Sequence, residues 1–285
     1  MGDDRDGVAS IRPTRENPQT DSKVLNLAPV YPVRPSGLRP EDRGSDMNTL
    51  RGGKMSHNKS ALIVGASRGL GLAIVRELLE RGWRVVGTAR EGKKSHLHAL
   101  AERYPKMLEI EHVDITDIGQ IAALKERLKG RTFDVLFVNA GVSNPRRETI
   151  GEVSTEEYVR VMITNSLSVM RGVEQLEENV CVGGVIGAMS SGLGSVANNE
   201  KGGLEVYRAS KAALNMLMRS FAARREHDDR ALLLLAPGWV KTDMGGADAS
   251  FSIEEVIHDI VDTIVAQEGK TGLHYLDRFG KTVRW

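Results

Sequence analysis

The sequence contains a single cysteine, Cys181, among its 285 residues. An intrachain disulfide and a cysteine-clustered metal site are therefore excluded. We expect no bound metal ion, and we predict that the protein is located in a reducing compartment, the cytoplasm. The sequence also lacks an excess of charge of either sign, because 39 basic residues balance 38 acidic ones to a net charge of +1. This balance gives no general attraction to nucleic acid or to an anionic membrane, so neither is expected as a partner.

A long hydrophobic run is missing from the N-terminal region. The apolar stretch of residues 24–33 is interrupted by Asn26, Pro29 and Pro32. Such a stretch is too short and too broken for a membrane span or for the core of a signal peptide.

Residues 1–57 differ from the remainder in composition. They hold six of the nine prolines and only one aromatic residue, Tyr31, without helical or strand periodicity. We expect this segment to be a disordered extension, a tag, or an over-extended reading frame that starts ahead of Met47 or Met55. Residues 58–285 are expected to form one folded domain.

Short apolar runs alternate with longer amphipathic segments in this domain. The alternation is typical of a parallel sheet wrapped by helices. The apolar runs predict seven strands, at residues 61–64, 84–88, 108–113, 135–138, 184–189, 231–235 and 272–276. We therefore predict an α/β fold with a single, doubly wound parallel sheet.

The helices between these strands are indicated by apolar residues at helical spacing. One such pattern runs from Leu70 to a stop at Gly82, and another from Ile118 to Gly130. Ser154, with Glu157 three residues later, has the spacing of a capping box and predicts the start of a further helix.

A glycine-rich turn directly follows the first predicted strand and opens the first predicted helix. Its sequence is Gly65-Ala66-Ser67-Arg68-Gly69-Leu70-Gly71. Glycines allow the backbone to approach a pyrophosphate closely, and the unpaired N–H groups of a helix start attract its negative charge. The position of the turn between a strand and a helix favours dinucleotide binding.

A phenol and an ammonium lie four residues apart at Tyr207 and Lys211. Residues at this spacing share one face of a helix. A buried ammonium stabilises a phenolate and lowers its pKa from about 10, which would allow Tyr207 to exchange a proton near neutral pH. On its own this pair more often marks a solvated helix face, so its meaning depends on the motifs around it.

These motifs together resemble the short-chain dehydrogenase/reductase family, whose Rossmann-type fold matches the predicted sheet. The spacing Gly65-x3-Gly69-x-Gly71 is similar to the family's glycine turn, although Val64 stands where threonine is usual, a change expected to loosen a hydrogen bond of the turn. The further matches follow in the family's order along residues 59–246: Asp114, Asn139-Ala140-Gly141, Asn165, Ser190-Ser191 and Pro237-Gly238-Trp239-Val240-Lys241-Thr242. Val138 departs from the family, which frequently has asparagine there.

The resemblance implies a role for each matched residue. Tyr207 would protonate the substrate oxygen, Ser191 would position that oxygen, and Lys211 would bind the nicotinamide ribose and keep Tyr207 acidic. Asn165 would hold a water that links Lys211 to solvent. The residues implied in cofactor binding are Gly65, Ser67, Arg68, Gly69, Leu70, Gly71, Arg90, Asp114, Ile115, Asn139, Ala140, Gly141, Tyr207, Lys211, Pro237, Gly238, Val240 and Thr242.

The catalytic serine requires a choice between positions. Many family members place it thirteen residues before the tyrosine, where this chain has Gly194. Ser191, sixteen residues before Tyr207, is chosen over Ser190 because it matches the second serine of the family's pair, and neighbouring strand positions point to opposite faces. The longer loop before Tyr207 resembles the branch of the family that holds the sniffer-type carbonyl reductases and the C-factor signalling proteins.

Two arginines indicate which nicotinamide cofactor is preferred. An NAD site needs a carboxylate at the end of the second strand, and here Ala89 occupies that place. Arg90 and Arg68 could both pair with a 2′-phosphate, so NADP(H) is predicted over NAD(H).

The sequence is compatible with three hypotheses for the function. The leading one is an NADP(H)-dependent oxidoreductase acting on a small carbonyl or alcohol, with a homodimer as a possible assembly. The second is a nucleotide-binding signalling or redox-sensing protein with little turnover. The third is a family enzyme that catalyses dehydration or epimerisation, for which no distinctive acid/base residue is present.

Overall fold

The structure, a computed structural model, describes residues 59–92, 94–145 and 148–285. All of these residues belong to one compact unit, Lys54–Trp285. The prediction for residues 1–57 concerns a segment outside the described residues.

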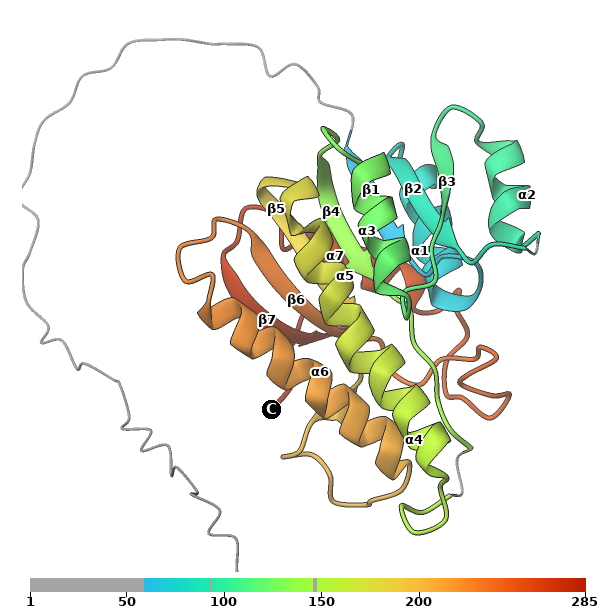
Figure 1. The fold of residues 1–285 in the computed structure, drawn as a ribbon, viewed down its shortest axis with the longest axis vertical. Helices are drawn as coiled ribbons and strands as arrows, with labels where there is room; N and C mark the ends of the chain where they lie inside the picture. Colours follow the sequence, from blue (N-terminus) through green and yellow to red (C-terminus); the bar gives the residue numbers. More distant parts are fainter. Residues whose placement is uncertain (1–58, 93, 146–147) are drawn as a thin grey trace, which may run out of the picture. The chain divides into compact units, whose positions relative to one another are not determined.

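Seven strands form one parallel sheet with the order β3-β2-β1-β4-β5-β6-β7 (Figure 1). The chain winds outward in both directions from the boundary between β1 and β4, so the predicted doubly wound parallel sheet is confirmed. The strands are β1 (Ser60–Val64), β2 (Arg84–Ala89), β3 (Leu108–His112), β4 (Phe133–Val138), β5 (Val180–Met189), β6 (Ala231–Ala236) and β7 (Gly272–Asp277).

The start of β5 differs from the prediction. The strand begins at Val180, four residues ahead of the predicted residue 184. Gly183 has a φ of +75°, and the pairing between β4 and β5 shifts register between Phe133 and Val135. Gly183 and Gly184 form an irregular stretch inside the strand. Because of this irregularity, the first part of β5 could not be recognised in the sequence as an apolar run.

The helices that join the strands are α1 (Gly69–Glu80), α2 (His96–Arg103), α3 (Ile118–Arg127), α4 (Thr155–Met162), α5 (Ser168–Leu176), α6 (Glu205–Ala223) and α7 (Ile257–Val265). Ser154 caps α4 by accepting the N–H of Glu157 at 3.2 Å, as predicted. The other half of the capping box is not formed, because the Glu157 carboxylate pairs with Arg160. Helix α2 was not predicted.

Two helical layers cover the sheet. Helices α1 and α7 pack together on one face, whereas α3, α5 and α6 lie side by side on the other (Figure 1). Successive residues of strand β1 point to opposite faces of the sheet. Ile63 is buried on the face covered by α1 and α7, and its neighbour Leu62 is buried on the face covered by α3, α5 and α6. None of the helices in the described part of the chain is long and apolar enough to cross a bilayer.

Candidate active site

The predicted site residues follow the carboxyl ends of the parallel strands. The glycine turn follows β1, Arg90 follows β2, Asp114 and Ile115 follow β3, Asn139 to Gly141 follow β4, Ser191 follows β5, and Pro237 to Thr242 follow β6. Parallel strands end at one common edge, and ligands of open α/β sheets bind at this edge where the strand order reverses. The order reverses between β1 and β4, beside the glycine turn.

The glycine turn packs directly against the segment that follows β4. A Cβ atom added at Gly71 would lie 2.1 Å from the carbonyl oxygen of Gly65, and one added at Gly65 would lie 2.8 Å from the backbone nitrogen of Ala140. The amide of Asn139 donates to the Gly65 carbonyl at 3.1 Å. No side chain larger than hydrogen fits at these two glycines, and Asn139 ties the two segments together.

A hydrogen bond from the neighbouring strand supports the turn in which Val64 replaces the usual threonine. Val64 faces Val138 in the pairing of β1 with β4, and both are buried, so the two departures from the family lie side by side as an apolar pair. The buried hydroxyl of Thr88, on β2, accepts the N–H of Gly65 at 3.0 Å. Thr88 belongs to a predicted strand but to no sequence motif, and its role in the site was not predicted.

The start of α1 fits a phosphate group. Its N-cap residue, Arg68, makes no side-chain capping bond, and the first turn contains no acidic residue. The first N–H groups of a helix need an acceptor and favour negative charge. Thr242 lies across from this turn, since a Cβ atom at Gly69 would lie 3.7 Å from its methyl group. The N–H groups at the start of α1, together with the glycine turn and Thr242, could therefore hold the pyrophosphate of a dinucleotide.

The two arginines have different surroundings. Arg90 is exposed directly after β2, and the preceding residue, Ala89, is buried and carries no charge. Arg68 forms an ion pair with Asp243 at 2.7 Å, between two exposed side chains. The glycine turn and the loop after β6 are thus linked by charge at the rim of the site.

Asp114 uses its carboxylate to fix its own turn. One carboxylate oxygen accepts from the backbone N–H of Thr116 at 2.9 Å and from its hydroxyl at 2.7 Å. The backbone N–H of Asp114 donates to the side chain of Gln120 at 2.8 Å. Ile115 is buried beside it. The segment after β3 therefore has a defined conformation at the adenine end of the predicted site.

Asn165 joins three parts of the structure. It lies in a π-helical turn, Ile163–Leu167, between α4 and α5, and is fully buried. Its side chain accepts the N–H of Val142 at 2.8 Å and donates to the Val142 carbonyl at 2.8 Å and to the Ser210 hydroxyl at 2.9 Å. Such π turns are frequent at functional sites. The amide of Asn165 therefore links the loop after β4 to α6, two segments that are distant from it in the sequence.

Lys211 lies in the same buried region. Its Nζ donates to the carbonyl of Met189 at 2.8 Å and lies 5.8 Å from the centre of the Tyr207 ring. A Cβ atom at Gly141 would lie 3.4 Å from Oδ1 of Asn165 and 3.6 Å from Nζ of Lys211. Burial lowers the pKa of Lys211 to about 8. The structure thus brings Gly141, Asn165, Tyr207 and Lys211 into one cluster.

The two serines after β5 have different environments. Ser190 is buried and donates to Oδ1 of Asn215 at 2.6 Å. Ser191 is half-buried, and its hydroxyl accepts the N–H of Leu193 at 3.1 Å. A Cβ atom at Gly194 would lie 2.9 Å from Cβ of Lys211, so a serine does not fit at the position that many relatives use. Of the two serines, Ser191 is the more accessible.

The loop after β6 is held by its own hydrogen bonds. Trp239 is exposed, and its indole N–H donates to the carbonyl of Gly245 at 2.8 Å. The N–H of Gly245 donates to the Thr242 hydroxyl at 2.9 Å, and Val240 pairs with Phe251 in a short bridge. These bonds give the Pro237 to Thr242 segment a fixed shape at the edge of the sheet.

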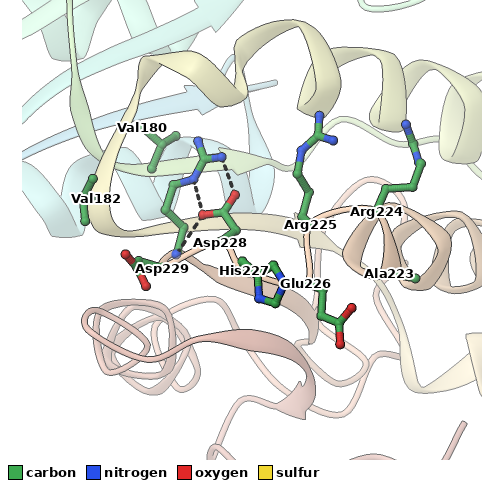
Figure 2. A pocket seen from close by; sticks show the side chains of 10 residues that line it. Val180, Val182, Ala223, Arg224, Arg225, Glu226, His227, Asp228 and Asp229 are labelled. Atoms are coloured by element: carbon green, nitrogen blue, oxygen red, sulfur yellow. Dashed lines mark hydrogen bonds and ion pairs between the residues drawn. The ribbon is translucent and has the colours of Figure 1, made fainter. Parts of the chain in front are cut away.

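A shallow hollow lies at the opposite end of β5 (Figure 2). It is lined by Val180, Val182 and residues 223–230. Its arginines pair with carboxylates: Arg224 with Glu174, Arg225 with Glu177, and Arg230 with Asp228. The hollow is at the amino end of the strand, so it is separate from the cluster at the carboxyl edge.

Comparison with known proteins identifies the class. The profile of the family described as short chain dehydrogenase matches residues 59–251. A structure of a putative short-chain dehydrogenase/reductase from Burkholderia multivorans with bound NADP is 56% identical, with a TM-score of 0.79 over 80% of this chain and all of that one. The carbonyl reductase Sniffer of Drosophila melanogaster is 28% identical, with a TM-score of 0.72 over 80% of this chain and all of that one. The C-signal protein of Myxococcus xanthus is 33% identical over 154 residues, which are 53% of this chain and 92% of that protein.

The chain therefore belongs to the short-chain dehydrogenase/reductase family, in a branch related to carbonyl reductases. As a member it is an NAD(P)-dependent oxidoreductase with a small-molecule substrate. The predicted family, fold and enzyme class are confirmed.

Proposed function

We propose that this protein is an NADP(H)-dependent carbonyl reductase in which Tyr207 delivers the proton. The observation that carries the proposal is the buried cluster of Lys211 and Asn165 beside Tyr207, at the same sheet edge as an uncapped helix start suited to phosphate. Reduction of an aldehyde or ketone at the expense of NADPH is the reaction to measure.

Each residue of the cluster has a distinct task in the proposed reaction. The reduced nicotinamide, when bound, supplies a hydride to the carbonyl carbon. Ser191 hydrogen-bonds the carbonyl oxygen and stabilises the charge that develops on it, and Tyr207 protonates this oxygen. Lys211 stabilises the phenolate that remains, while Asn165 orders the loop after β4 next to Lys211.

A preference for NADP(H) over NAD(H) is part of the proposal. Arg90 is exposed at the end of β2. A carboxylate at this place would repel a 2′-phosphate, and the residue there, Ala89, carries no carboxylate. Arg68 contributes from the glycine turn, its charge being shared with Asp243. The bound NADP of the Burkholderia relative supports this choice.

Replacing Arg90 by alanine tests the preference. We expect the dissociation constant of NADPH to rise about tenfold, because a charge-assisted bond to the phosphate is lost, while that of NADH changes little. Fluorescence titration with both nucleotides measures the two constants. Arg84→Ala, at the exposed opposite end of the same strand, is the matched control and should alter neither. Equal loss of affinity for both nucleotides, or wild-type binding of NADH at least as tight as NADPH, would contradict the assignment.

A second candidate function is a signalling or redox-sensing role with little turnover. Similarity to the C-signal protein of Myxococcus xanthus is the observation that favours it. A family fold is compatible with both functions, so the decision depends on whether Tyr207 is needed.

A further inference from the structure

A buried group of polar side chains behind Ser191 has no task in the reaction described above. It consists of Ser190 after β5, Asn215 on α6 and Tyr275 on β7, which are 1%, 3% and 2% exposed. Buried polar groups are costly unless they are hydrogen-bonded, so the partners of these three indicate what they hold in place.

The hydroxyl of Tyr275 holds the backbone of Ser191. It donates to the Ser191 carbonyl at 2.6 Å, and the same carbonyl accepts the N–H of Gly194 at 2.9 Å. Burial raises the pKa of Tyr275 above its ordinary value. Hydrogen bonds with Asn215 and Ser190 lower this pKa, but the effect of burial is larger. The phenol therefore keeps its proton and remains a donor throughout the neutral range.

Asn215 connects this turn to the helix that carries Lys211. It lies four residues after Lys211, on the same face of α6. Its amide donates to the Gly194 carbonyl at 3.2 Å, and its Oδ1 accepts the Ser190 hydroxyl at 2.6 Å. The residue before Ser191 and the turn after it are therefore both tied to α6, and the Tyr275 hydroxyl ties Ser191 itself to β7.

The ring of Tyr275 is held from its other side. Trp285 packs against it with ring centres 5.2 Å apart, and the carbonyl of Trp285 accepts the N–H of Ala197 at 2.9 Å. The phenol thus lies between an aromatic neighbour and the loop that carries Ser191. A side chain held in this way can fix the direction of a single hydrogen bond.

We infer that Tyr275 is a positioning residue for Ser191: its hydroxyl holds the Ser191 carbonyl so that the Ser191 hydroxyl is directed at the substrate oxygen. This inference rests on the proposed function, in which Ser191 binds that oxygen. Small displacements of a group that binds the reacting oxygen are costly to the rate, and the cost falls on the chemical step. A tyrosine that served only the packing of β7 would have no such effect.

A double-mutant cycle of Tyr275→Phe and Ser191→Ala tests the inference. Phenylalanine keeps the ring against Trp285 and removes only the hydroxyl. We expect Tyr275→Phe to lower kcat for carbonyl reduction about tenfold, with an unchanged dissociation constant for NADPH. In the Ser191→Ala background the same change should lower kcat less than twofold, because the hydroxyl that Tyr275 positions is already absent. Nucleotide titration confirms that each variant is folded.

Tyr104→Phe, a half-buried tyrosine at the end of α2, is the matched control and should keep the wild-type kcat. A wild-type kcat in Tyr275→Phe would overturn the inference, as would the full tenfold loss in the Ser191→Ala background. Either result in an active enzyme leaves the proposed function intact. Absence of carbonyl reduction by the wild-type protein would instead overturn the proposed function together with this inference.

Discussion

Tyr207→Phe is expected to lower kcat for carbonyl reduction about a thousandfold while NADPH binding is retained. The change removes only the hydroxyl that donates the proton, and loss of a general acid typically costs between a hundredfold and ten-thousandfold in rate. Steady-state kinetics with NADPH and an aldehyde or ketone measure the loss, and fluorescence titration measures the binding. Tyr104→Phe again serves as the control.

The same variant separates the enzyme from a signalling protein. A cell that carries Tyr207→Phe should lose the phenotype of the active protein if catalysis is its function. If the phenotype persists while the variant binds NADPH but does not turn over, the protein acts through nucleotide binding. Reduction of the carbonyl by Tyr207→Phe at the wild-type rate would remove Tyr207 from the mechanism.

Lys211→Met is expected to lower kcat at least a hundredfold at neutral pH. Lys211 is buried with its Nζ 5.8 Å from the centre of the Tyr207 ring, and its charge stabilises the phenolate formed by proton transfer. Methionine has a similar length and no charge. The exposed Lys106→Met is the matched control. An unchanged kcat in Lys211→Met would show that the charge has no part in the reaction.

The free energy of unfolding should carry a second signature of Lys211. The folded protein releases the Lys211 proton at about pH 8, whereas the unfolded chain holds it up to the ordinary pKa of 10.5. The unfolded state therefore binds more protons between these values, and stability contributed by this site rises with pH across this window. Below pH 8 both states are protonated and the cost of burying the charge is fully present.

Urea unfolding of wild type and Lys211→Met at pH 7.5 and 9.5 measures this signature. The difference in unfolding free energy between the two proteins should shift in favour of wild type by about 2 kcal/mol from the lower to the higher pH. Titrations of groups that Lys211 does not influence occur in both proteins and cancel in the comparison. Repeating the pair in a Tyr207→Phe background removes the contribution of Tyr207, whose ring lies beside Lys211. A constant difference would mean that Lys211 keeps an ordinary pKa in the folded protein.

The sheet could be predicted from the sequence because its strands are buried on both faces. Residues such as Leu62 and Ile63 point to opposite helical layers, and both must be apolar. The prediction was incomplete where the chain departs from this rule. Gly183 interrupts β5, and α2 is a short helix at the edge of the sheet that buries only Leu97 and Leu100.

The candidate site was predictable only where its residues form local motifs. The glycine turn and the spacing of Tyr207 and Lys211 can be read within a few residues. Thr88 and Tyr275 are single residues in strands, and their hydrogen bonds reach Gly65 and Ser191 across 23 and 84 positions of the chain. No local pattern marks such contacts, because they arise from the pairing order of the sheet.

The most direct test of the central claim is to follow the hydrogen that wild-type protein transfers. NADPH carrying deuterium in place of both hydrogens at the reactive carbon of the nicotinamide is incubated with the protein and a ketone or aldehyde, and the product is analysed by mass spectrometry and NMR. The proposed function predicts an alcohol with one deuterium on the former carbonyl carbon, formed in equal amount to the NADP produced. Tight NADPH binding without deuterated alcohol from any carbonyl compound tested would contradict it.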